Sequence, residues 1–137
     1  MDNKKNVKPD GGGTKYPIVV NMSTPMTFKT ILQNHSNVYR NASMIVTKNM
    51  IEFVSTNAGC TLMGTSKLEC ICDVERPYSI LINQTRKNWV PAFKRVTKDM
   101  VARLDIYEDH AQVAISEEGS NHQTIYKAPC ELVDVST

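Results

Sequence analysis

The sequence lacks a hydrophobic run long enough to cross a membrane, and its first residues are polar. A membrane-spanning helix needs about 20 consecutive apolar residues, and a secretory signal peptide has an apolar core near its start. Neither pattern occurs in the 137 residues of the chain. We therefore expect an intracellular protein that has no membrane partner.

Cysteine is also scarce. Domains that depend on a disulfide framework have a much higher density of cysteine. Cys70 and Cys72, joined by His110 or His122, would make a zinc site on paper, but the spacing matches no closed structural zinc pattern. Because unpaired cysteine is common in protein cores, we expect core thiols and no metal site. The four cysteines are Cys60, Cys70, Cys72 and Cys130.

The sequence also lacks the common signatures of catalysis. It has no glycine-rich phosphate-binding loop, no nucleophile elbow and no closely placed pair of carboxylates in a suitable context. The acidic pair Glu117-Glu118 is typical of a solvated turn. We therefore expect a protein that is not an enzyme and that needs no cofactor.

The excess of basic over acidic residues is small, with 16 Lys and Arg against 14 Asp and Glu and a formal net charge of +2. Such a total does not indicate a nucleic-acid-binding protein, for which a local basic patch is needed. The length is that of one domain with its own core. We expect a flexible tail at residues 1–15, which show no apolar periodicity, and a single domain at residues 16–137.

The first half of the domain alternates between strand and helix signals. Residues 18–20 are β-branched, and Thr24 followed by Pro25 is a good helix start, with apolar side chains then recurring on one face to residue 38. Residues 44–47 and 50–55 flank Lys48-Asn49, a plausible hairpin turn. Residues 61–69 alternate loosely as a further strand.

The central stretch, residues 78–113, predicts a strand, a short basic helix and a β-hairpin. Residues 78–83 are rich in Ile and Leu, and Trp89 and Phe93 then define the apolar face of a helix. With Asn88 as the N-cap, Pro91 falls in the first turn, where its missing N–H is not needed, and the helix ends near Thr97.

From residue 100 the period of the pattern becomes two, and residues 111–116 form the second strand of the hairpin. Residues 123–135 add one or two extended segments. Two helices among many short antiparallel strands predict an α+β fold, an antiparallel sheet with two helices packed on one face.

Basic side chains gather around the two predicted helices and are free to point away from their apolar faces. For any one helix, a solvated surface is the ordinary explanation of such residues. A surface that attracts phosphate groups is the alternative. The residues concerned are Lys29, Arg86, Lys87, Lys94, Arg95 and Lys98.

The order of these elements resembles one domain of a DNA sliding clamp of the proliferating cell nuclear antigen type, over roughly residues 16–135. The segment ILINQTRKNWVPAFKRV resembles the clamp strand that leads into the second helix, and KDMVARLDIYEDHAQVAI resembles the hairpin that follows. The segment QTIYKAPCELVDV resembles the closing strand of such a domain. The likeness is one of overall pattern, without a signature motif.

The resemblance implies that six such domains close into a ring, with the helices lining a hole that holds duplex DNA. Lys29, Arg86, Lys87, Lys94, Arg95 and Lys98 are then expected to contact phosphates without reading the base sequence. Homo-oligomers would form through edge strands, for which residues 111–116 and the strand ending near Leu68 are the candidates. A polymerase or another replication or transcription factor is the expected further partner.

The sequence also departs from the clamp pattern, because a cellular clamp chain has two such domains joined by a connector. The chain is therefore either a single-domain relative, plausibly from a large DNA virus, or a piece of a longer chain. The resemblance implies that it acts in the nucleus or, if it is viral, at sites of viral DNA replication. An alternative function is a clamp-fold scaffold for protein interaction or transcription that does not encircle DNA.

Overall fold

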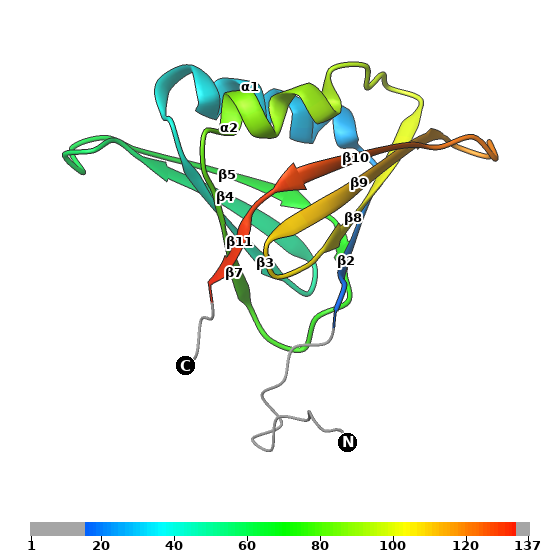
Figure 1. The fold of residues 1–137 in the computed structure, drawn as a ribbon, viewed down its shortest axis with the longest axis horizontal. Helices are drawn as coiled ribbons and strands as arrows, with labels where there is room; N and C mark the ends of the chain where they lie inside the picture. The colour runs from blue at the N-terminus through cyan, green and yellow to red at the C-terminus, as the bar shows by residue number, and fades with distance from the viewer. Residues whose placement is uncertain (1–15, 134–137) are drawn as a thin grey trace.

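The computed structural model describes residues 16–133, and these form two antiparallel sheets with the helices lying across them. The predicted fold class is confirmed, with the strands divided between two sheets of five. The expected tail at residues 1–15 and the last four residues lie outside the described part. Figure 1 shows α1 and α2 side by side over the wide end of the two sheets.

The strands and helices follow the sequence closely in the first half of the domain. Thr24 occupies the N-cap position of α1 and Pro25 begins the helix, although the Thr24 hydroxyl makes no capping hydrogen bond. The elements are β2 (Ile18–Met22), α1 (Pro25–Val38), β3 (Ala42–Thr47), β4 (Met50–Thr56), β5 (Met63–Glu69) and β6 (Ile71–Cys72).

The second half contains the second helical segment and the remaining strands. The elements are β7 (Tyr78–Ile82), α2 (Thr85–Asn88), the 3-10 helix η1 (Val90–Phe93), β8 (Met100–Ile106), β9 (His110–Glu117), β10 (Thr124–Pro129) and β11 (Glu131–Val133). One sheet has the order β10-β9-β8-β2-β6, and the other has the order β11-β7-β3-β4-β5.

The second helix differs from the predicted one. It begins earlier, after Gln84 in a left-handed conformation, and it is divided at Trp89 into α2 and η1. Pro91 explains the division, because it has no N–H for a helical bond and its ring clashes with the carbonyl four residues before it. Asn88 is therefore the last residue of α2 and not an N-cap.

The core lies between the two sheets and the helices. Phe28 of α1 is fully buried, and its ring lies edge-on to those of Phe53 and Phe93 at centroid distances of 5.7 and 5.0 Å. Trp89 is also fully buried, and its indole N–H donates a 2.7 Å hydrogen bond to the Pro129 carbonyl at the end of β10. The apolar faces predicted for the two helical segments are buried, with Phe28 and Ile31 from the first and Trp89 and Phe93 from the second.

Phe93→Ala is expected to lower the free energy of unfolding by about 3–5 kcal/mol, because it removes a fully buried ring and leaves a cavity. Urea denaturation measures the change. Ile71→Ala is the control, since Ile71 is 73% exposed and its truncation should change stability by less than about 0.5 kcal/mol. Equal stability of Phe93→Ala and the parent would contradict the packing of η1 on the core.

Within residues 16–133, no helix is long and apolar enough to cross a membrane.

Candidate functional site

The helical layer formed by α1, α2, η1 and the segment up to Lys98 contains all six of the predicted phosphate-binding residues. Lys29 is half-buried, and the other five are exposed. Within the described part of the chain, none of the six forms an ion pair with an acidic side chain. The layer is therefore a basic surface, with Phe28, Trp89 and Phe93 buried beneath it.

Two of these basic residues hold the helices together. The Lys29 ammonium donates a 3.0 Å hydrogen bond to the Lys94 carbonyl, which joins α1 to the end of η1. The Arg86 guanidinium donates to the Asn37 side-chain oxygen, which joins α2 to α1. Their charges remain on the surface, but their positions are fixed by these contacts. Sequence reasoning had no signal for these bonds, because the partners are 65 and 49 residues away.

Lys98 has a different environment from the other five. It lines a hollow together with Asp99, Glu117 and Glu118, where β9 ends and the turn to β10 begins. Nearby carboxylates weaken the attraction of a lysine for phosphate. Lys94 shares a hollow with one carboxylate, that of Glu117, whereas Lys98 shares its hollow with three, which makes Lys94 the stronger candidate of the two for contact with an anionic polymer. Lys87, which is exposed on α2, is the second strong candidate.

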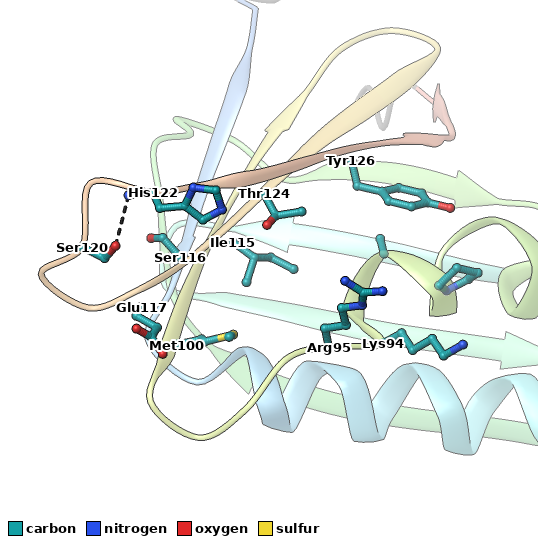
Figure 2. A pocket seen from close by; sticks show the side chains of 12 residues that line it. Lys94, Arg95, Met100, Ile115, Ser116, Glu117, Ser120, His122, Thr124 and Tyr126 are labelled. Carbon is teal, nitrogen blue, oxygen red and sulfur yellow. Dashed lines mark hydrogen bonds between the residues drawn. The ribbon is translucent and has the colours of Figure 1, made fainter.

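A pocket of about 590 Å³ lies between η1 and the β9–β10 hairpin. Ala92, Met100 and Ile115 give it an apolar floor, and Arg95 and Tyr126 lie at its margin. Figure 2 shows Arg95 reaching toward the space below Tyr126, while Lys94 runs beside α1. Sequence reasoning missed this pocket, because it depends on how the hairpin lies over η1.

The pocket is lined by two serines, Ser116 and Ser120, and by His122, and among the described residues neither serine has a side-chain hydrogen bond to the His122 ring. The Ser120 hydroxyl accepts a 3.0 Å hydrogen bond from the main-chain N–H of His122, as the dashed line in Figure 2 shows. A nucleophile and its base need a side-chain to side-chain hydrogen bond instead. The Ser120 contact is therefore that of a turn.

Each sheet has two edge strands, which are β10 and the short β6 in one sheet, and β5 and the short β11 in the other. β5 is an edge of its sheet, as the sequence predicted. The predicted edge at residues 111–116 is wrong, because residues 124–129 form β10 and pair with β9 from Thr124–Ile115 to Pro129–His110. The free edge on that side is β10. Figure 1 shows the β4–β5 and β9–β10 hairpins projecting in opposite directions.

Both of these edges carry exposed apolar side chains. On the β5 side, Leu62 is 55% exposed, Met63 is 66% exposed, and Val38 at the end of α1 is 60% exposed. On the β10 side, Ile125 is 62% and Tyr126 is 39% exposed. Five of the nine large apolar side chains that are exposed in the described chain thus lie at these two edges. Contiguous apolar groupings on a protein surface are typical of interaction surfaces.

The end of α1 is fixed onto β5 by a buried histidine. His35 Nδ1 lies 2.8 Å from the Ser55 hydroxyl on β4, and Nε2 lies 3.0 Å from the Ser66 hydroxyl on β5. Tyr39 packs against Gly64, where an added Cβ would lie 2.9 Å from the tyrosine ring. Burial lowers the pKa of His35. His35 is therefore a packed residue that joins α1 to both strands of the β4–β5 hairpin.

We expect the free energy of unfolding to fall as the pH is lowered below about 6.5, the ordinary pKa of histidine. The folded state holds His35 with a lowered pKa, so the unfolded state binds more protons in this window. His35 then contributes a slope of at most about 1.4 kcal/mol per pH unit, and its contribution is complete above the unfolded pKa. Urea titrations between about pH 5 and 8 measure this slope.

His35→Gln should remove that slope, whereas His122→Gln, at an exposed position, should keep it. A parent protein whose stability is the same at both ends of the pH range would contradict the assignment.

The metal site considered from the sequence has no third ligand. Cys70 and Cys72 lie together, but among residues 16–133 no group of three or more His, Cys, Asp or Glu side chains is placed to hold a metal ion.

The arrangement of the domain is similar to that of DNA sliding clamps among solved structures. For PCNA from Thermococcus kodakaraensis the TM-score is 0.67 at 15% identity, and the match covers 88% of this chain and 48% of that chain. The Helicobacter pylori beta clamp has a TM-score of 0.62 at 14% identity, covering 98% of this chain and 36% of that one. The DNA polymerase III subunit beta DnaN sliding clamp from Bartonella birtlesii has a TM-score of 0.62 at 12% identity, covering 98% and 37%.

This chain thus spans about half or less of the length of each of these proteins. No protein-family model and no curated protein matches the sequence. The likeness at these identities shows a clamp-like fold.

Proposed function

We propose that the chain is a non-catalytic sliding-clamp subunit that assembles head to tail and binds duplex DNA non-specifically through its helical layer. The observation that carries the proposal is the pair of unpaired strand edges, β5 and β10, on opposite sides of the domain, both with exposed apolar side chains. The clamp-like fold supports it independently.

Different edges on opposite sides fit a head-to-tail interface. In such an interface, β10 of one copy pairs with β5 of the next copy. A row of copies built in this way has a free β5 at one end and a free β10 at the other, until the two ends meet and the ring closes. Closure pairs every β5 and β10 edge and with this removes the risk of uncontrolled strand pairing at these two strands. Resemblance to clamps gives about six copies as the number that closes a ring of single domains.

The pocket between η1 and β10 fits the same assembly. If β10 and the next copy's β5 pair into one continuous sheet, the faces of the two strands that the helices cover lie on the same side of that sheet. We call this side the inner face. The end of α1 lies over that inner face of β5, through His35 and Tyr39. It therefore comes to lie beside η1 of the first copy. Val38, exposed at the end of α1, then packs into the pocket.

Closure of the ring also places every helical layer on one inner surface. Lys29, Arg86, Lys87, Lys94, Arg95 and Lys98 of each copy then surround the DNA, and we rank Lys87 and Lys94 first. Contacts of lysine and arginine with phosphate are independent of base sequence and weaken with salt, which is compatible with movement along the duplex. We infer a place of action where DNA is replicated, with a polymerase or a similar factor as a further partner.

The test of this function combines two measurements on the parent protein. Native mass spectrometry or light scattering at micromolar concentration should give a closed oligomer, and duplex DNA affinity should fall steeply with salt. A protein that stays monomeric at all concentrations would reject the ring.

A clamp-fold scaffold that does not encircle DNA is the second candidate. It is favoured because three of the six basic residues already interact within the domain. Lys29 and Arg86 donate hydrogen bonds within the chain, and Lys98 lies among carboxylates. An oligomer without salt-dependent DNA binding would support this candidate over the first.

A further inference from the structure

Two cysteines lie where the chain passes from one sheet to the other. Cys70 follows β5, the edge of one sheet, and Cys72 ends β6, the edge of the other. The Cys70 N–H donates to the Asn49 carbonyl at 3.1 Å, and the Cys72 N–H donates to the Lys48 carbonyl at 3.0 Å. The β3–β4 turn therefore fixes the backbone of both cysteines.

The two thiols are in direct contact. The Cys70 and Cys72 sulfurs are 3.4 Å apart, Cys72 is 4% exposed and Cys70 is half-buried. The hydrogen bond from Cys72 lowers the pKa of Cys70, while the same bond and burial raise the pKa of Cys72. Cys70 is thus the sulfur that ionises first, and it is the more accessible of the two.

The other two cysteines lack this arrangement. Cys60 is exposed, with no thiol partner among residues 16–133. Cys130 is 9% exposed, and burial raises its pKa to about 12. A shared metal ion does not explain the pair either, because the described chain offers no third ligand beside it.

We propose that Cys70 and Cys72 form a dithiol site for small disulfides of the glutathione class, with Cys70 as the attacking sulfur and Cys72 as the resolving sulfur. The motive is the pair of sulfurs 3.4 Å apart on a fixed backbone, one of them accessible and the other buried. This inference is independent of assembly and of DNA binding.

The reaction has two thiol–disulfide exchange steps. Cys70 first loses its proton, and its thiolate attacks one sulfur of the small disulfide. A mixed disulfide forms, and one small thiolate is released, which takes up the proton that Cys70 lost. Cys72 then loses its proton and attacks the Cys70 sulfur, which forms the Cys70–Cys72 bond and releases the second small thiolate. In sum, two protein thiols are oxidised by two electrons, and one small disulfide is reduced to two thiols.

The first step prepares the second. The contact with Cys70 is the largest cause of the raised pKa of Cys72. Once Cys70 is part of a mixed disulfide it has no thiolate to hold the Cys72 proton, so Cys72 ionises more readily.

The geometry also makes the product reversible. In an extended chain, the Cα atoms of residues two apart, such as Cys70 and Cys72, are separated by about 6.6 Å. This is close to about 6.8 Å, the upper limit of the Cα–Cα distance across a disulfide. The sulfurs must move from 3.4 Å to about 2.05 Å apart. A disulfide formed under such strain is readily reduced, as in labile or regulatory bridges.

The experiment uses the full chain with Cys60→Ser, which removes the exposed cysteine. The reduced protein is incubated with glutathione disulfide, quenched with acid and measured by intact mass. We expect loss of two hydrogens with no retained glutathione, and recovery of the starting mass after mild reduction. The same chain with Cys72→Ser should instead retain one glutathione at Cys70, and with Cys70→Ser it should retain none.

Cys130 is the internal control for reactivity. At a pH of about 7.5, a thiol with a pKa of about 12 is ionised about 1000-fold less than one at the ordinary value of 9.0. The more basic thiolate is intrinsically more nucleophilic, which offsets about 30-fold of this difference. Iodoacetamide should therefore label Cys70 at least about 30-fold faster than Cys130.

Two results would overturn the proposal, and neither depends on a variant that might fail to fold. One is similar labelling rates for Cys70 and Cys130 in the parent. The other is a parent in which peptide mapping, after prolonged incubation with glutathione disulfide, finds Cys70 and Cys72 still as free thiols or finds Cys70 still joined to glutathione.

Discussion

Ile125→Asp and Met63→Asp are each expected to convert the assembled protein into monomers. Both side chains are more than 60% exposed in the single chain, so the monomer should stay folded. In the assembly each lies on an edge strand that meets another copy, where an unpaired carboxylate loses its water. We expect the dissociation constant of the interface to rise at least about 100-fold, since burial of one unpaired charge costs several kcal/mol.

An equal mixture of the two variants should give dimers. The Ile125→Asp chain keeps an intact β5, and the Met63→Asp chain keeps an intact β10, so one unaltered interface can form between them. No further copy can add to either end. A symmetric interface that used one and the same edge in both copies would give a different result, with no rescue in the mixture.

Val133→Asp is the matched control, because Val133 is 43% exposed and lies on β11, an edge strand that takes no part in the proposed interface. It should assemble like the parent. Analytical ultracentrifugation of the three variants and of the mixture gives the masses. Parent-like oligomers of Ile125→Asp and Met63→Asp would disprove the β5–β10 interface.

The second large effect is expected from Lys87→Glu combined with Lys94→Glu, which should weaken binding to duplex DNA roughly tenfold or more at moderate salt. Each lost phosphate contact also reduces the slope of log affinity against log salt by about 0.9. The change should be the same for duplexes of different sequence. The two side chains are exposed, so thermal stability should change little.

The control changes the same amount of charge elsewhere. Lys48→Glu with Arg103→Glu alters two exposed residues outside the helical layer and should keep most of the affinity. Lys98→Glu, among carboxylates, should have a smaller effect than Lys94→Glu. Fluorescence anisotropy with labelled duplexes at several salt concentrations measures all of them. Equal losses in the control and the test variant would show that total charge alone is responsible.

Local patterns in the sequence predicted much of this fold. The start of α1, the Lys48-Asn49 turn and the alternation after Met100 each depend on a few neighbouring residues, and the corresponding elements occur in the structure. The burial of Trp89 and Phe93 was also predictable, because the second helical segment was too short to be stable without packing on a sheet.

The failures have a different physical origin. The sequence correctly predicted helical structure around Pro91, but it did not predict that the helix starts at Thr85. That start depends on a hydrogen bond from the Gln84 N–H to the Asn41 side-chain oxygen, 43 residues away. The mistaken edge at β9 arose in the same way, since pairing with β10 follows a turn that had no strong hairpin signal. Which basic residues remain available also depends on such distant contacts, as Lys29 demonstrates.

Trp89 gives the protein an intrinsic optical reporter. It is the only tryptophan in the chain, it is fully buried, and its indole N–H is bonded to the end of β10. Its emission should therefore respond when the β10 end moves or takes up a neighbour, as well as when the core melts. Stopped-flow mixing of the parent, with excitation of this single fluorophore, can then follow the joining of edges in real time without an attached dye.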